Sequence, residues 1–145
     1  MYTIADIEKI TGGKSLFSNN TAAVIEHLLI DSRKLLFPAS TLFFALPGPR
    51  RQGNAFVKDL YNKGVRNFIA DADFVFLPED FAAANIIQVK DVLHALQQLT
   101  AHHRSRFIFP VIGITGSNGK TIVKEWLYQL LQTDFNIVRS PKSYN

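Results

Sequence analysis

A glycine-rich loop between an apolar segment and an amphipathic segment is the feature that most constrains the fold of this chain. The apolar residues 111–115 lead into the loop Gly-Ser-Asn-Gly-Lys-Thr at residues 116–121, and a helical pattern follows over residues 120–132. A strand, a glycine loop and a helix in this order are the parts of a nucleotide-binding α/β fold. The helix is expected to pack its apolar face in a core, because its large apolar residues recur at spacings of three and four: Val123, Trp126, Leu127, Leu130 and Leu131.

The residue types of this loop fit the binding of a nucleotide phosphate. Glycines let backbone N–H groups face phosphate oxygens, and the amino terminus of a helix adds positive potential. Lys120 would reach the β- and γ-phosphates of ATP, and the Thr121 hydroxyl would hold Mg²⁺. The general pattern GxxxxGK[ST] is matched incompletely, since Ile114 stands where its first glycine belongs. The alternative interpretation is a glycine-rich turn with a solvent-facing lysine. We predict ATP and Mg²⁺ as cofactors, bound by Gly116, Ser117, Asn118, Gly119, Lys120 and Thr121.

The residues before this loop alternate between helix and strand patterns. Thr3 and Asp6 form a capping box for a short helix that ends at Gly12-Gly13. Asn54 is predicted to cap a helix to about residue 63, and Asp91 to cap another. Strands are predicted at residues 25–30, 41–46, 65–70, 85–89, 111–115 and 136–139. The predicted fold class is therefore α/β, in two parts that meet near residues 104–110.

Composition and charge exclude several classes of protein. The chain of 145 residues has a net charge of +4 from scattered basic residues, so we expect no nucleic acid partner. The absence of cysteine excludes disulfides, thiolate catalysis and Cys-based metal sites. Because His102 and His103 are expected on different sides of a helix and no carboxylate stands at ligand spacing, no histidine metal site is predicted. No leader or membrane span is recognised, and a cytoplasmic location is expected.

The glycine loop and three upstream segments together carry a family resemblance. Gly-Ile-Thr-Gly-Ser-Asn-Gly-Lys-Thr at residues 113–121 is similar to the ATP loop of the Mur ligases, TG[TS]NGK[TS], which departs from the general pattern in the same way. The upstream segments resemble that family's uridine-nucleotide domain: Ile-Asp-Ser-Arg at 30–33, Thr-Leu-Phe-Phe-Ala-Leu-Pro-Gly at 41–48 and Gln-Gly-Asn-Ala-Phe at 52–56. The resemblance covers the whole chain.

This resemblance implies a domain organisation and a reaction. Residues 1–106 would form a small α/β domain that binds a UDP-muramoyl peptide, and residues 107–145 would begin a P-loop ATP-binding domain. Family members are ATP-dependent amide ligases of peptidoglycan precursor synthesis, in which an amine attacks an acyl phosphate, and Lys120 is the implied catalytic residue. Because the second part has so few predicted elements, we expect the N-terminal piece of a longer enzyme, which binds substrate but is inactive alone.

The resemblance also implies partners and substrate contacts. Lys124-Glu125 is similar to the branch that adds D-alanyl-D-alanine to UDP-N-acetylmuramoyl-tripeptide. The tripeptide-forming branch and another P-loop ligase or kinase are the alternatives. The last six residues, Ser-Pro-Lys-Ser-Tyr-Asn, resemble versions fused to an alanine racemase. By motif position, the implied substrate contacts are Ile30, Ser32, Pro49, Arg50, Arg51 and Asn145.

Four further expectations concern single features. Arg33 would either bind ligand or pair with Asp31, and Asn54 would either contact ligand or only cap a helix. Phe43 and Phe44 are expected to pack in the core. The apolar face of the helix over residues 120–132 would be under-covered in a chain of this length, which predicts a homo-oligomer, an exchanged arrangement or disorder there.

Overall fold

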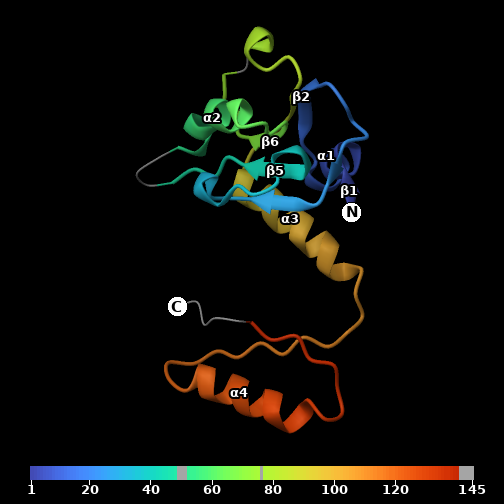
Figure 1. Cartoon of the computed structure of the whole chain (residues 1–145), viewed down its shortest axis with the longest axis vertical. Helices are drawn as coiled ribbons and strands as arrows, with labels where there is room; N and C mark the ends of the chain where they lie inside the picture. Colours follow the sequence, from blue (N-terminus) through green and yellow to red (C-terminus); the bar gives the residue numbers. More distant parts are fainter. Residues whose placement is uncertain (49–51, 76, 141–145) are drawn as a thin grey trace. The chain divides into compact units, whose positions relative to one another are not determined.

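The computed structural model describes residues 1–48, 52–75 and 77–140 (Figure 1). The chain divides into two compact units, Met1–Phe107 and Ile108–Asn145. None of the helices in the described part of the chain combines the length and apolar character needed to cross a membrane. The first unit holds the sheet, and the second is built around one helix.

A five-stranded sheet forms the centre of the first unit, in the order β2-β7-β6-β5-β4. Four of its strands run parallel: β4 (His27–Leu29), β5 (Thr41–Phe44), β6 (Asn67–Ala70) and β7 (Asn85–Gln88). β2 (Lys14–Ser18) pairs antiparallel with β7, and a separate two-stranded sheet joins β1 (Tyr2–Thr3) to β3 (Val24–Ile25). The carboxyl ends of four parallel strands therefore lie along one edge, where α/β sheets bind ligands.

Helices cover both faces of this sheet, which confirms the predicted α/β class (Figure 1). α1 (Ile4–Thr11) and α3 (Val92–Ser105) pack on one face, and α2 (Val57–Asn62) packs on the other. The strand β5 is apolar at successive positions because Phe44 points toward α1 and α3 while Phe43 points toward α2. Both phenylalanines are buried, as predicted.

The predicted helix caps are confirmed where they depend on local sequence alone. The Thr3 hydroxyl accepts from the backbone N of Asp6, and the Asp6 carboxylate accepts from the backbone N of Thr3, which completes the capping box of α1. Gly12 ends α1 in the left-handed region, with φ of 61°. Asp91 caps α3 by accepting from the backbone N of His94 at 2.9 Å.

Four short 3₁₀ helices lie in the connections of the first unit. They are η1 (Ser32–Lys34), η2 (Pro38–Ser40), η3 (Gly53–Phe56) and η4 (Pro78–Asp80). The first two lie between β4 and β5, and η3 leads from the segment after β5 into α2. A 3₁₀ helix, η1, thus begins three residues after the end of β4.

Several predictions about the first unit are wrong in detail. Asn54 does not cap a helix, because it lies inside η3 and its amide binds Asp71 instead. The predicted strand at 25–30 is divided between two sheets, and β2 was not predicted, because its half-buried pattern has no strong alternation. His102 and His103 do not point to opposite sides of α3, since the Nδ1 atoms of both lie within 3.3 Å of the Tyr2 hydroxyl.

The second unit contains α4 (Lys120–Leu131), at the position where a helix was predicted. No strand occurs over its described residues 108–140, so the strands predicted at 111–115 and 136–139 are wrong. A strand forms only where its backbone groups pair with a neighbour, and these segments have no such partner between residues 108 and 140. The predicted core position of Trp126 is also wrong, because 63% of this residue is exposed.

Candidate functional site

The turn after β4 holds the first two predicted substrate contacts. Ile30 follows the last residue of β4 and is 58% exposed, and Ser32 begins η1 in a half-buried position. An exposed isoleucine beside a partly buried hydroxyl offers an apolar surface and a hydrogen-bonding group within three residues. The structure therefore brings Ile30 and Ser32 to the edge of the sheet where its parallel strands end.

The shape of this turn depends on Asp31 and Arg33. The Asp31 carboxylate accepts from the backbone N of Arg33 at 3.1 Å and so caps η1. It also accepts from Arg33 Nε at 2.9 Å and from Arg33 Nη2 at 2.7 Å. These hydrogen bonds lower the pKa of Asp31 from 3.8 to about 2, the largest effect coming from the Arg33 side chain. Of the two roles considered for Arg33, the structure shows the pairing with Asp31.

The loop after β5 is closed at its base by two backbone contacts. Pro47 and Gln52 form an antiparallel bridge, and the backbone N of Gly53 donates to the carbonyl of Leu46 at 3.0 Å. Gly53 lies so close to the chain that a Cβ there would be 2.3 Å from the carbonyl carbon of Ala45. The predicted contacts at the tip of this loop, Pro49, Arg50 and Arg51, lie outside the described residues.

An acidic residue at this edge was not singled out from the sequence. Asp71 is the first residue after β6, and its Oδ1 accepts from Asn54 Nδ2 at 2.7 Å. The signal that could have found it is its position, since the residue after a parallel strand lies at the same edge as the ends of neighbouring strands. Asp71 is thus placed beside the base of the loop after β5.

The glycine loop of the second unit leads directly into α4. Gly116 and Gly119 have φ of 150° and 77°, a region that residues with a Cβ rarely adopt, and α4 begins at Lys120. The first N–H groups of a helix have no partner within the helix, so they are available to an anion. Lys120 Nζ donates to the carbonyl of Gly116 at 2.6 Å, and Ser117, Asn118 and Thr121 are exposed around it. These features fit a phosphate group and a magnesium ion.

Charged and aromatic side chains hold the segment after α4 against the helix. The Glu125 carboxylate pairs with Lys124 and with Arg139, and the Arg139 guanidinium lies 4.1 Å from the centre of the Tyr128 ring. Lys124 Nζ also donates to the carbonyl of Ser140 at 3.0 Å. The chain is therefore fixed up to Ser140, and the predicted contact Asn145 lies outside the described residues.

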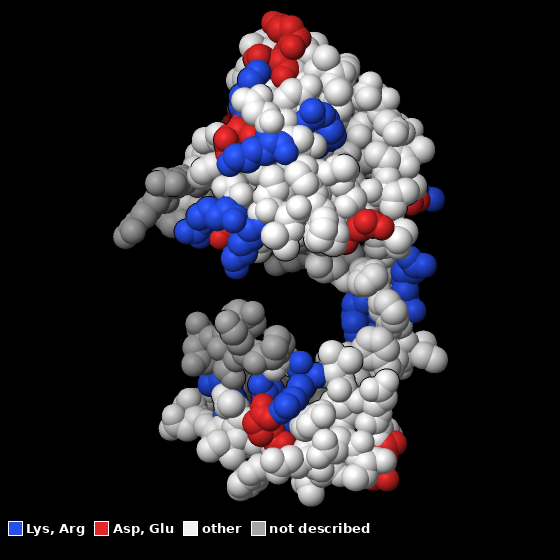
Figure 2. Space-filling view, viewed as in Figure 1, with Lys and Arg blue, Asp and Glu red and all other residues white. Residues whose placement is uncertain are grey.

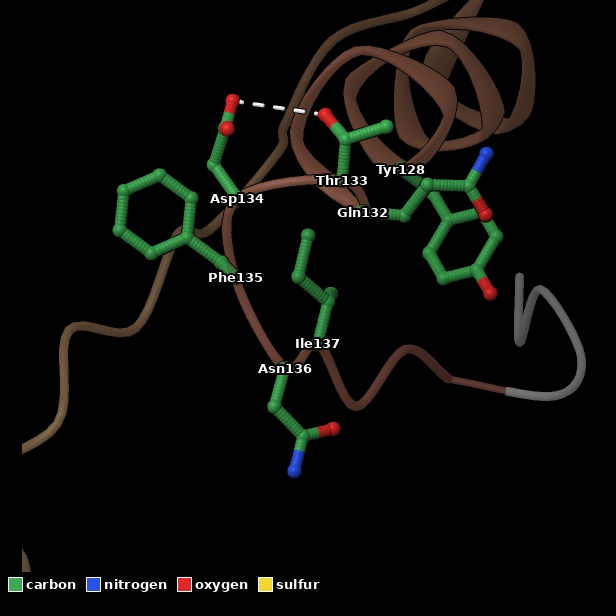
Figure 3. Close-up of a pocket in the computed structure, with 7 residues that line it drawn as sticks. All are labelled: Tyr128, Gln132, Thr133, Asp134, Phe135, Asn136 and Ile137. Carbon is green, nitrogen blue, oxygen red and sulfur yellow. Dashed lines mark hydrogen bonds between the residues drawn. The ribbon is translucent and has the colours of Figure 1, made fainter.

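A hollow in the second unit lies at the opposite end of α4 from the glycine loop (Figure 3). No predicted site residue lines it; the lining residues are Tyr128, Gln132, Thr133, Asp134, Phe135, Asn136 and Ile137. At its wall, the Thr133 hydroxyl donates to the Asp134 carboxylate at 3.4 Å (Figure 3). The hollow is therefore separate from the phosphate site that the sequence predicts.

Charged side chains of both signs lie on the surface of the two units. Lys and Arg are interspersed with Asp and Glu over the visible face of each unit (Figure 2). Within the described residues, no group of three or more His, Asp and Glu side chains is placed to hold a metal ion. The features that remain are the edge of the sheet in the first unit and the glycine loop in the second.

A comparison with protein families identifies the family of this chain. Residues 24–104 match the model described as Mur ligase family, catalytic domain. The chain belongs to the Mur ligase family. The matched range contains the turn after β4 and the loop after β5, while the glycine loop lies beyond it.

The relatives within the Mur ligase family align with most of this chain, but the aligned region is a small part of each relative. The chain is 32% identical over 143 residues to the UDP-N-acetylmuramoyl-tripeptide--D-alanyl-D-alanine ligase of Bacillus subtilis (strain 168), covering 99% of this chain and 30% of that protein. The enzyme of the same name from Synechocystis is 33% identical over 121 residues, or 83% of this chain and 26% of its own length. A crystal structure of MurF from Acinetobacter baumannii superposes with a TM-score of 0.74 at 27% identity, covering 92% of this chain and 28% of that one. The chain thus spans less than a third of the length of these relatives.

Proposed function

We propose that this chain supplies the substrate-binding domain and the ATP loop of a peptidoglycan precursor ligase. This ligase joins D-alanyl-D-alanine to UDP-N-acetylmuramoyl-tripeptide. The observation that carries the proposal is the alignment of nearly the whole chain with a Bacillus subtilis enzyme of that activity. The proposed domains are residues 1–106 for the muramoyl nucleotide and residues 107–145 for ATP, and the proposed location is the cytoplasm.

The uridine nucleotide would bind along the carboxyl ends of β4 and β5. Ile30 offers an exposed apolar surface to the uracil, and Ser32 offers a hydroxyl from η1. Pro49, Arg50 and Arg51 are proposed as contacts to the diphosphate, because arginine binds phosphate oxygens through forked hydrogen bonds. The bridge between Pro47 and Gln52 supports this assignment, since it anchors both ends of the segment that carries these residues.

Mg-ATP would bind at the glycine loop and supply the phosphoryl group that activates the substrate carboxylate. Backbone N–H groups of residues 116–121 and the Lys120 ammonium would neutralise phosphate charge, and the Thr121 hydroxyl would hold Mg²⁺. Lys120 Nζ already lies within the loop, 2.6 Å from the Gly116 carbonyl, so phosphate oxygens would take the place of that acceptor. Asn145 is proposed as a substrate-side or metal-side residue from its motif position alone.

The relatives are more than three times as long as this chain, so the chain alone should bind substrate without forming an amide. The chemistry needs two anions and an amine to be held together, which requires groups from several domains. Amide formation by the purified 145-residue chain would contradict this part of the proposal.

Calorimetric titration of the purified chain tests the assignment. UDP-N-acetylmuramoyl-tripeptide, UDP, UMP and Mg-ATP are titrated separately, and folding is checked by thermal unfolding. We expect the muramoyl nucleotide to bind more tightly than UDP, and Ser32→Ala to weaken both. Lys9→Ala, an exposed change on α1, is the control and should leave both affinities unchanged. A folded chain that binds no uridine ligand would leave only the interpretation as another P-loop enzyme.

A further inference from the structure

Asp71 connects the carboxyl ends of three neighbouring parallel strands. Its Oδ1 accepts from Asn54 Nδ2 at 2.7 Å, in the turn after β5, and from the backbone N of Asp73 at 3.1 Å. Its carbonyl oxygen accepts from the backbone N of Phe74 at 3.2 Å and from Nε2 of Gln88, the last residue of β7, at 3.4 Å. One residue therefore ties β5, β6 and β7 together at the edge where the nucleotide is proposed to bind.

The Asn54 side chain is committed to this contact. Its Nδ2 donates to Asp71, while its Oδ1 is buried without a hydrogen-bond partner in the described structure. A buried acceptor without a partner destabilises the fold, and an apolar residue at this position would avoid that cost. The hydrogen bond to Asp71 is thus the stabilising contact of the Asn54 side-chain amide.

Asn54 is also linked rigidly to the loop after β5. It follows Gly53, whose backbone is packed against Ala45 and Leu46 and hydrogen-bonded to the Leu46 carbonyl. One residue earlier, Gln52 bridges to Pro47 and closes the loop. A displacement of Asn54 would therefore pass directly to the end of that loop.

We propose that Asn54 and Asp71 are positioning residues for nucleotide diphosphate binding. Their hydrogen bond fixes the carboxyl-terminal end of the loop after β5, which carries Arg50 and Arg51, without either side chain touching the ligand. This inference rests on the proposed function, because it assumes that these arginines contact the diphosphate. It adds an acidic residue that directly follows β6 to a site otherwise assigned to the turns after β4 and β5.

Exchanging the two side chains tests the proposal. Asn54→Asp places two carboxylates in contact and should push the loop end away from Asp71. The double variant, Asn54→Asp with Asp71→Asn, again has one amide donor and one carboxylate acceptor, but at exchanged positions. By titration of the 145-residue chain, we expect Asn54→Asp to lower UDP affinity about tenfold and uridine affinity less than twofold. The exchanged double variant should return to within about twofold of the original UDP affinity.

The contrast between UDP and uridine separates positioning from a general loss of structure. Asp59→Asn, which removes an exposed ion pair with Lys63 on α2, is the matched control and should leave both affinities unchanged. Equal losses of UDP and uridine affinity in Asn54→Asp, unchanged UDP affinity, or a double variant that regains thermal stability but not UDP affinity would each overturn the proposal. An original chain that binds neither ligand would overturn the proposed function, and this inference with it.

Discussion

Arg33 and Asp31 form a bidentate ion pair directly after β4, with Nε 2.9 Å from Oδ1 and Nη2 2.7 Å from Oδ2. The same carboxylate caps η1 through the backbone N of Arg33. The pair therefore braces the turn that presents Ser32, although the Arg33 side chain is largely exposed to solvent. Exposed ion pairs add little stability. The main role of this pair is therefore to fix the conformation of the turn.

The contribution of this pair to stability should disappear in acid. The pKa of Asp31 is about 2 in the folded chain, below its ordinary 3.8, because the Arg33 hydrogen bonds favour the carboxylate. A group with a lowered folded pKa stabilises the fold above its unfolded pKa, and that stabilisation is lost as pH falls through the folded value. The difference in unfolding midpoint between the original chain and Asp31→Asn should be constant from pH 7 to 5 and vanish between about pH 4 and 2. A difference that is unchanged at pH 2 would contradict this.

A methyl group at Gly53 should destabilise the first unit. A Cβ there would lie 2.3 Å from the Ala45 carbonyl carbon and 2.6 Å from both the N and the O of Leu46, and these backbone atoms belong to the first two residues after β5. Gly53→Ala should lower the free energy of unfolding by about 1–3 kcal/mol, as overpacked sites do. Urea unfolding measures it. Gly113→Ala is the control, because nothing lies within 4 Å of a Cβ at that position. Equal stability of the two variants would refute the close packing.

A buried row of hydrogen-bonded amides at the amino ends of the strands should also be sensitive to substitution. Asn85 Nδ2 donates to Asn67 Oδ1 at 2.7 Å, and Asn67 Nδ2 donates to the Thr41 carbonyl at 3.2 Å, so the row joins β5, β6 and β7. Asn85 Oδ1 also accepts from the backbone N of Asn20 at 2.9 Å. Asn85→Ala leaves the Asn67 oxygen and the Asn20 N–H without these partners.

Each buried group left without a partner costs about 1–3 kcal/mol, so Asn85→Ala should lose at least that much stability in urea unfolding. The exposed Asn62→Ala on α2 provides the comparison and should change stability by less than about 0.5 kcal/mol. Similar losses in the two variants would show that the row is filled by water after the substitution.

Sequence reasoning succeeds in this chain where the determining interactions are local. Thr3 with Asp6, Gly12 and Asp91 mark helix ends through contacts within a few residues, and each prediction is confirmed. The buried strand β5 was also predicted, because its two apolar faces require cover on both sides.

It fails where a distant segment decides the outcome. Asparagine is a common helix-capping residue, yet the Asn54 amide donates instead to Asp71, 17 residues away. Residues 111–115 have the composition of a strand, yet they have no pairing partner among the described residues of their unit. For the candidate site, Ile30 and Ser32 were predicted from a motif, whereas Asp71 belongs to no motif and its position follows only from the order of the strands. The roles of all the predicted site residues stay predictions, both in the first unit and in the glycine loop.

The exposed apolar face of α4 should drive self-association of the chain. Trp126 and Leu130 lie four residues apart on this helix and are 63% and 73% exposed, and Ile122 is also exposed on it. Burial of such a face against a second copy removes apolar surface from water. Sedimentation velocity should show a concentration-dependent dimer that Trp126→Ser with Leu130→Ser abolishes. Leu93→Ser, at an exposed leucine of α3, should leave the dimer intact. A chain that stays monomeric at every concentration would contradict the prediction.

Removing the Lys120 ammonium should separate ATP use from substrate binding. In the structure the Lys120 ammonium donates to the Gly116 carbonyl at 2.6 Å, within the second unit. In a protein of full ligase length that carries this chain, Lys120→Ala should reduce ATP-dependent ligation by about a hundredfold to a thousandfold, the effect of deleting one charge-stabilising donor. UDP affinity, measured on the same preparation, should be unchanged, because the uridine contacts are proposed in the first unit. Parallel loss of ligation and UDP affinity would mean that the two ligands do not occupy separate sites.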